Sequence, residues 1–170
     1  MAIEDRDRIF PRIWQGGRPD AETEDQRWAP YNAGFDVVVF CAKEWQPAPG
    51  VFPNVRVFHA FLDDSGTGPP SKEELRDANA TARKIAFLHL RGARLLITCQ
   101  QGLNRSGLVS ALTIRNLTGS SGFWARNEVQ KHRRAKRIYG VLAFPLFNSD
   151  FVSYLDSLPA KAPLSISTAP

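Results

Sequence analysis

The feature that most constrains this chain is one segment, LLITCQQGLNRSGLVSALTI, which runs from Leu95 to Ile114. Its first residues form a short, continuously apolar run that is typical of a buried strand. From Leu108 onward the residues are apolar at helical spacing. A polar loop with a cysteine, a glycine and an arginine joins the two runs. The segment therefore predicts a buried strand, a tight loop and a helix in direct succession.

Apolar strand patterns alternate with helical patterns along the rest of the chain. The expected strands are residues 12–15, 36–41, 55–61 and 94–98. The expected helices are residues 23–31, 71–90, 106–117, 123–134 and 148–158. Ser71 and Glu74 have the capping-box spacing that opens the second of these helices. The alternation predicts an α/β fold in a single domain, with a central, mostly parallel, twisted sheet flanked by helices.

Composition narrows the class of protein further. The chain has 170 residues, 43% of them apolar and 23% charged, which fits one globular domain. No apolar run approaches the roughly 18 residues that a membrane span needs, and the N-terminus has no apolar signal core. Cys41 and Cys99 are the only cysteines, which excludes a disulfide-rich scaffold and favours a reducing compartment. We therefore expect a cytoplasmic protein with no membrane insertion.

Positive charge gathers in one stretch near the C-terminus, where only Glu128 opposes it. The basic residues of this stretch are Arg126, Lys131, Arg133, Arg134, Lys136 and Arg137. Such a patch can attract nucleic acid, phosphorylated proteins or anionic lipid. The same residues also fit a solvated helix face whose basic C-terminal end suits the helix dipole. The sequence leaves both interpretations open.

The loop after the strand at 94–98 has the chemistry of a phosphate-binding loop. A helix N-terminus presents backbone N–H groups without intrahelical partners, and these groups bind anions. Gly102 allows the loop to curve tightly, and the guanidinium of Arg105 can bind two phosphate oxygens at once. The same amides favour the thiolate form of a cysteine at the start of the loop, so Cys99 becomes a candidate nucleophile toward phosphorus. The candidate phosphate-binding residues are Gln100, Gln101, Gly102, Leu103, Asn104 and Arg105.

These residues also carry a family resemblance. Residues 99–107, CQQGLNRSG, resemble the CxxGxxR(S/T)G signature of cysteine-based protein tyrosine phosphatases, and the chain's compact size resembles the dual-specificity branch. Weaker similarity extends to residues 12–17, 34–39 and 148–155. The resemblance implies a dual-specificity phosphatase-like catalytic domain over residues 1–158. Residues 159–170, which are rich in Pro, Ala and Ser, are expected to form a disordered tail.

The resemblance implies a mechanism that uses no metal and no cofactor. Cys99 would attack phosphorus, Arg105 would bind the phosphate, and Ser106 would hydrogen-bond the sulfur and help it to leave. The reaction would hydrolyse phosphate monoesters through a phosphocysteine intermediate. One position departs from the family pattern, because the usual histidine before the nucleophile is replaced by Thr98. The three histidines of the chain are scattered without the spacing of a metal site.

The family's general acid is an aspartate on a loop upstream of the cysteine. The segment Leu62-Asp63-Asp64-Ser65 follows an expected strand and precedes a glycine-containing turn. Its match to the family pattern favours Asp64 as the acid, with Asp63 as the second candidate. Both aspartates also fit a simple structural role in the turn, where Asp is common.

Cys41 lies at the end of an expected strand, in a run similar to the corresponding strand end of tensin-like lipid phosphatases. That similarity implies a redox partner for Cys99, because the matching cysteine there can form a reversible disulfide with the nucleophile. The alternative is a small buried apolar residue with no redox role.

The loop side chains bear on the substrate. None of the variable positions Gln100, Gln101, Leu103 and Asn104 is cationic, which argues against polyphosphoinositides and favours phosphotyrosine, phosphoserine or phosphothreonine in a protein or peptide. The Gly-x-Asn-Arg-Ser-Gly segment also resembles RNA 5′-triphosphatases, for which the basic stretch from Arg126 to Arg137 would bind nucleic acid. A third hypothesis is a catalytically weak, phosphate-binding pseudophosphatase, which the replacement of the usual histidine by Thr98 would favour.

Overall fold

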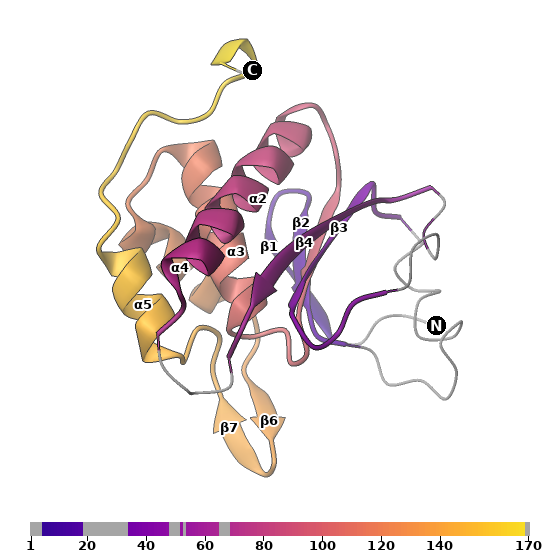
Figure 1. Ribbon diagram of the computed structural model, residues 1–170, viewed down its shortest axis with the longest axis vertical. Helices are drawn as coiled ribbons and strands as arrows, with labels where there is room; N and C mark the ends of the chain where they lie inside the picture. The colour runs from indigo at the N-terminus through magenta and orange to yellow at the C-terminus, as the bar shows by residue number, and fades with distance from the viewer. Residues whose placement is uncertain (1–4, 19–33, 48–51, 53, 65–68, 169–170) are drawn as a thin grey trace.

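The computed structural model describes residues 5–18, 34–47, 52, 54–64 and 69–168 (Figure 1). Its main sheet has five strands in the order β1-β2-β5-β3-β4. Their bounds are Arg6–Phe10 for β1, Ile13–Gly16 for β2, Leu95–Thr98 for β5, Val37–Ala42 for β3 and Arg56–Leu62 for β4. β1 is antiparallel to β2, and every other neighbouring pair is parallel. The predicted α/β fold with a mostly parallel sheet is confirmed.

The described helices cover one side of this sheet (Figure 1). They are α2 (Lys72–Leu90), α3 (Arg105–Thr118), α4 (Gly122–His132) and α5 (Ser149–Asp156), followed by a short 3-10 turn at Ile166–Thr168. α3 packs against β2, β3 and β5, while α2 packs against β4 and α4 against β1. α3 is therefore the central helix, and its first turn lies at the carboxyl end of β5.

The local signals in the sequence account for these elements. Every residue of β3 and of β5 is buried, as the continuously apolar runs predicted. α2 begins at the expected capping box, in which the Ser71 hydroxyl accepts from the Glu74 amide at 3.1 Å and the Glu74 carboxylate accepts from the Ser71 amide at 2.8 Å. Because β2, β3, β4 and β5 are parallel, their carboxyl ends lie at one edge of the sheet, where ligand sites of such sheets form.

The edge strand β1 is not among the strands expected from the sequence. Its residues, RDRIF, are mostly charged, and the strand leaves most of its side chains partly or fully exposed. Charged residues are common on edge strands, where they discourage pairing with other chains, and they hide the alternating pattern of a buried strand. The pairing of Arg6 with Gly16 brings the N-terminal segment beside the end of β2.

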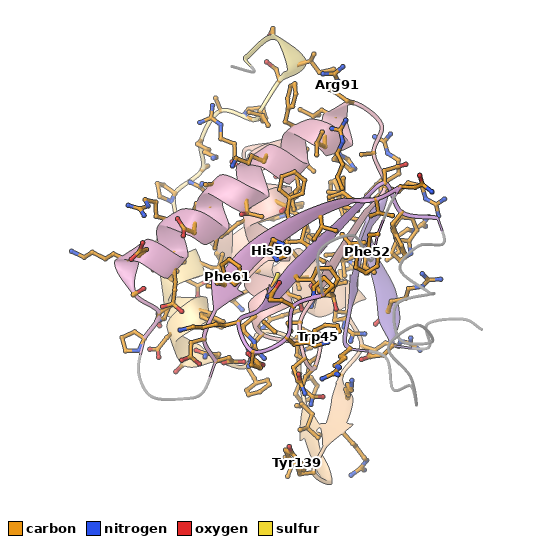
Figure 2. The ribbon with its side chains drawn as sticks, turned by 45° about the vertical axis from the view of Figure 1, so that its right-hand side comes forward. Trp45, Phe52, His59, Phe61, Arg91 and Tyr139 are labelled. Carbon is orange, nitrogen blue, oxygen red and sulfur yellow. The ribbon has the colours of Figure 1, made fainter. Side chains whose placement is uncertain are left out.

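A second unexpected feature is a hairpin between α4 and α5, which projects from the body of the molecule (Figure 1). It consists of β6 (Lys136–Ile138) and β7 (Val141–Ala143), paired antiparallel. The two turn residues, Tyr139 and Gly140, both have positive φ, at 49° and 82°, as a two-residue hairpin turn requires. Tyr139 is 98% exposed at the tip (Figure 2).

Two further expectations concern the ends of the described ranges. The helix expected at residues 23–31 lies outside the described residues. Disorder of the tail at 159–170 stays a prediction; within it, the Lys161 amide donates to the Gly119 carbonyl at 2.9 Å, and the Leu164 amide donates to the Asn116 carbonyl at 2.7 Å. None of the helices described is long and apolar enough to cross a membrane.

Candidate active site

The loop from Cys99 to Asn104 connects β5 to α3 at the carboxyl edge of the sheet, as the sequence predicted. The four consecutive carbonyl oxygens of residues 100–103 all accept hydrogen bonds from groups outside the loop. The Gln100 oxygen accepts from the Arg18 amide, and the Leu103 oxygen accepts from the Leu146 amide. The Gln101 and Gly102 oxygens accept from side chains. In a planar trans peptide the N–H points opposite to the C=O, so the amides of residues 101–104 face the inner side of the loop.

The sulfur of Cys99 lies on that inner side. The Gly102 amide donates to Cys99 Sγ at 3.2 Å, and Ser106 Oγ lies 3.3 Å from the same sulfur. Both contacts are buried and both come from the start of α3 or the loop that leads into it. Hydrogen-bond donors and the dipole at a helix N-terminus stabilise a thiolate over a thiol. The arrangement is therefore suited to a cysteine nucleophile.

Arg105, the first residue of α3, is held from one side by Glu44 in the loop after β3. Its Nη1 donates to Glu44 Oε2 at 2.5 Å, and its side chain is only 9% exposed. Burial alone would raise the pKa of Glu44, but the hydrogen bond and positive charge of Arg105, together with a backbone hydrogen bond at Glu44 itself, outweigh burial and lower the pKa of that carboxyl. Arg105 Nε is buried and has no hydrogen-bond partner among the described residues, so it is a donor still available to an anion in the loop.

The aspartate favoured by the sequence, Asp64, contacts the loop through an asparagine. Its two carboxylate oxygens accept from Asn104 Nδ2 at 3.0 Å and from Asn148 Nδ2 at 2.7 Å. The Asn104 carbonyl oxygen in turn accepts from the amides of Phe147 and Asn148. Asp63 is exposed, and its amide donates to Glu74 at the start of α2. Of the two aspartates, Asp64 is thus the one tied to the phosphate-binding loop.

The side chains of the loop's other candidate residues differ in how accessible they are. Leu103 is fully buried, and the Asn104 side chain is occupied by Asp64 and the residues before α5. Gln100 and Gln101 are half-buried. Among the described residues no group of three or more His, Cys, Asp or Glu side chains is arranged to hold a metal ion.

Thr98, which directly precedes Cys99, is the position at which the sequence departs from the family pattern. Thr98 is completely buried, and its hydroxyl has no hydrogen-bond partner among the described residues. It therefore supplies neither a charge nor an observed hydrogen bond to the loop.

Cys41 is fully buried in β3, the strand next to β5, and both cysteines are free thiols. Burial raises the pKa of the Cys41 thiol well above its usual value, and the neighbouring Cys99 raises it further. Cys41 therefore interacts electrostatically with Cys99, and its own thiol is only weakly acidic.

Most cations of the basic stretch are paired within the molecule. Arg126 pairs with Asp156. Arg133 pairs with Asp5 and Asp7, Arg134 with Asp7, and Lys136 with Asp5. These three aspartates offset part of the positive charge of the stretch, which weakens its attraction for a polyanion.

Four residues of the site were not identified from the sequence. Glu44 and Asn148 fix Arg105 and Asp64, while Gln15 and Arg133 bind the loop from outside. Glu44 and Gln15 each lie at or just after the carboxyl end of a predicted strand, which was an available signal. Arg133 was singled out only as part of the basic stretch, and its aspartate partners lie more than 120 residues earlier in the chain.

Solved dual-specificity phosphatases have the same fold. Tk-PTP in its active form aligns with a TM-score of 0.66 and 22% identity, over 90% of this chain and 97% of its own. A mouse putative dual specificity phosphatase, complexed with zinc tungstate, aligns with a TM-score of 0.64 and 21% identity, over 88% and 83%. Human DUSP28 aligns with a TM-score of 0.61 and 22% identity, over 89% and 93%. No family model and no curated protein matches the sequence. The fold implied by the resemblance is therefore confirmed: the chain has the fold of the dual-specificity phosphatases.

Proposed function

We propose that this chain is a cysteine-dependent phosphatase that hydrolyses phosphate monoesters on proteins or peptides. The observation that carries the proposal is the environment of Cys99 Sγ, which receives the Gly102 amide at 3.2 Å and faces Ser106 Oγ at 3.3 Å. Arg105, with a buried donor still available, starts the helix beside it. A nucleophile, amide donors and a guanidinium converge at one helix N-terminus, which is the arrangement that phosphoryl transfer needs.

The proposed reaction has two steps. In the first, the Cys99 thiolate attacks phosphorus, an S–P bond forms, the bond to the leaving oxygen breaks, and Asp64 gives that oxygen a proton. In the second, Asp64 takes a proton from water, the resulting hydroxide attacks phosphorus, and the S–P bond breaks. Ser106 donates to the departing thiolate, while Arg105 and the loop amides bind the phosphoryl oxygens in both steps.

The electrostatics of the site favour a protein or peptide substrate over RNA. An RNA 5′-triphosphatase would need free cations to bind the strand, and four of the six cations in the basic stretch are paired with aspartates. The loop itself brings only one cation, Arg105, to the phosphate. We keep RNA as a comparison substrate for this reason.

The test compares wild type, Cys99→Ser and Asp64→Ala on p-nitrophenyl phosphate, a phosphotyrosine peptide and a 5′-triphosphorylated RNA. We expect wild type to prefer the peptide, Cys99→Ser to be inactive, and Asp64→Ala to lose about 10²- to 10⁴-fold in rate. Activity that survives in Cys99→Ser would refute the mechanism. A wild type that binds inorganic phosphate but turns over none of the three substrates would be a pseudophosphatase, and preference for RNA would identify a triphosphatase.

A further inference from the structure

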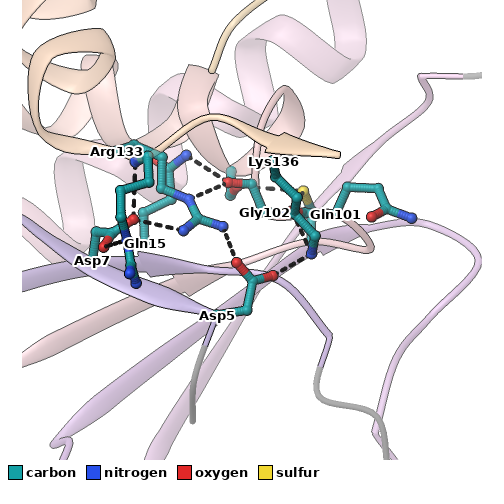
Figure 3. A network of polar contacts seen from close by, with 10 residues as sticks. Asp5, Asp7, Gln15, Gln101, Gly102, Arg133 and Lys136 are labelled. Atoms are coloured by element: carbon teal, nitrogen blue, oxygen red, sulfur yellow. Dashed lines mark hydrogen bonds and ion pairs between the residues drawn. The ribbon is translucent and has the colours of Figure 1, made fainter. Parts of the chain in front are cut away.

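A cluster of polar and charged side chains contacts the outward carbonyls of the phosphate-binding loop (Figure 3). This outer cluster consists of Asp5, Asp7, Gln15, Arg133 and Lys136. Its members come from the β1–β2 region at the start of the chain and from the segment after α4, so the fold assembles them from two distant parts of the sequence. None of them has a part in the reaction proposed above.

Arg133 is the centre of the outer cluster. Its side chain is only 2% exposed, and each of its three nitrogens makes a different contact. Nε donates to the Gly102 carbonyl at 2.9 Å, Nη1 to Asp7 at 2.7 Å and Nη2 to Asp5 at 2.6 Å. Gln15 Nε2 donates to the same Gly102 oxygen, also at 2.9 Å. The two aspartates balance the buried guanidinium and fix its orientation toward the loop.

Lys136 makes the neighbouring contact. Its ammonium pairs with Asp5 and lies 3.5 Å from the Gln101 carbonyl oxygen. Side chains alternate along a strand, and the next residue of β6, Arg137, is exposed on the other face and donates only to the Gly140 carbonyl in the hairpin turn. Of these two adjacent cations of β6, Lys136 contacts the loop and pairs with Asp5, whereas the contact described for Arg137 is with the hairpin turn.

The outer cluster can influence the Cys99 sulfur through the peptide groups of the loop, since it contacts their carbonyl oxygens while their amides lie on the side of the sulfur. The Gln101 carbonyl belongs to the same planar peptide as the Gly102 amide, which donates to Cys99 Sγ at 3.2 Å. The Gly102 carbonyl shares its peptide with the Leu103 amide, which faces the inner side of the loop. A cation at the oxygen end of a peptide polarises it and strengthens the donor at the nitrogen end. The cations thus act on the two amides that face the nucleophile and its substrate.

We propose that Arg133 and Lys136 are positioning residues for Cys99, which bind two consecutive carbonyls from outside the loop and so hold and polarise the amides inside it. The Thr98 hydroxyl has no hydrogen-bond partner among the described residues, so the position before Cys99 adds no side-chain hydrogen bond to those that Arg133, Lys136 and Gln15 make from outside the loop. The relevance of the proposal to catalysis rests on the proposed function, but its effect on the sulfur does not.

The test measures the rate at which iodoacetamide alkylates Cys99 as a function of pH, in a Cys41→Ser background so that one thiol reacts. The variants are Lys136→Met and Arg133→Lys, which keeps a charge for the aspartates but loses the planar donor to Gly102. Arg137→Met is the matched control, because it removes the same charge from the adjacent residue of the same strand. Lys136→Arg is the conservative variant that should restore the wild-type behaviour.

We expect the midpoint of the alkylation profile to rise by about half a pH unit in Lys136→Met and Arg133→Lys, and to stay unchanged in Arg137→Met. Turnover of p-nitrophenyl phosphate should fall about tenfold in kcat/KM in the same two variants, with thermal unfolding of Lys136→Met close to that of wild type. Unchanged midpoints, or an equal shift in Arg137→Met, would overturn the proposal. Shifted midpoints in a protein that hydrolyses no substrate would uphold it and reject the proposed function instead.

Discussion

The Gly102→Ala variant places a methyl group between the phosphate-binding loop and the end of β2. A Cβ built on Gly102 would lie 2.3 Å from the Gly17 nitrogen, 2.4 Å from the Gly16 carbonyl carbon and 2.6 Å from the Gly16 oxygen. Ordinary van der Waals contact begins near 3.4 Å, and all three atoms belong to the backbone and have no rotamer in which to move away. The loop must therefore shift by about 1 Å, and a displacement of that size at reacting groups lowers a rate by about 100-fold.

Backbone strain adds a second effect at the same position. Gly102 has a φ of +70°, which an alanine adopts at a cost of about 1–2 kcal/mol. Gly140, at the tip of the β6–β7 hairpin, has a similar φ of +82°, but a Cβ there would meet nothing within 4 Å. Gly140→Ala therefore carries the strain without the collision, and it serves as the matched control.

The assay compares urea unfolding and p-nitrophenyl phosphate kinetics for wild type and both variants. We expect each variant to lose about 1–2 kcal/mol in the free energy of unfolding from strain, with a further loss in Gly102→Ala from the collision. Only Gly102→Ala should lose about 100-fold in kcat/KM, which corresponds to about 2.7 kcal/mol of transition-state stabilisation. If Gly102→Ala kept kcat/KM within about threefold of wild type, the loop would not be seated against β2 as described, and the reasoning would be wrong.

Three further predictions test the surroundings of the site. Thr98→Val should raise the free energy of unfolding by about 1 kcal/mol in urea titrations, because it removes a buried hydroxyl that has no observed partner; a loss of that size would mean that the hydroxyl is bonded. Burial alone would raise the pKa of Asp7, but the hydrogen bonds from Arg134 and Arg133 and the charge of Arg133 together outweigh burial and lower that pKa. The ionised Asp7 should therefore contribute its full stabilisation of the fold above the usual Asp pKa near 3.9, and this stabilisation should fade as the pH drops through the lower pKa of the folded protein. Asp7→Asn should thus be less stable than wild type by about 1–3 kcal/mol at pH 7, and the gap should close in acid. Mild peroxide should form a disulfide between Cys41 and Cys99, faster at higher pH because burial raises the pKa of Cys41; unchanged inactivation kinetics and undiminished rescue by reductant in Cys41→Ser would exclude it.

The sequence predicted the part of the fold that depends on local patterns. The strands at 36–41 and 94–98 were identifiable because both their faces are buried, so nearly every residue in them is apolar. The start of α2 followed from the spacing of Ser71 and Glu74 alone, since a capping box is a contact between residues three apart. The strand, loop and helix around Cys99 followed for the same reason, because the chemistry and the geometry occupy one continuous segment.

What the sequence did not predict depends on contacts between distant residues. β1 was missed because its charged side chains lie on the exposed edge of the sheet, and its pairing with β2 sets the place of Asp5 and Asp7. The basic stretch near the C-terminus was treated as a surface patch because Asp5 and Asp7, which pair with three of its cations, are some 130 residues away. These two omissions have one cause, which is that the strand β1 was not predicted. Arg133 can be recognised as a loop support only when its carboxylate partners are known, and those partners are placed by β1.

The conformation of the loop depends on residues from distant parts of the domain, and the signature sequence of the loop is not enough by itself to form a binding site. The segment from Cys99 to Arg105 supplies the sulfur, the amides and the guanidinium, but each of its outward carbonyls is held by a residue from elsewhere. An isolated loop with the same residues would sample many conformations, because fixing each residue's backbone costs about 1–2 kcal/mol. The hydrogen bonds from Arg18, Lys136, Arg133, Gln15 and Leu146 offset that cost at successive positions. Changes to the side chains of β1 and β6 that lie beside the loop, such as Asp7 and Lys136, should therefore alter the reactivity of Cys99.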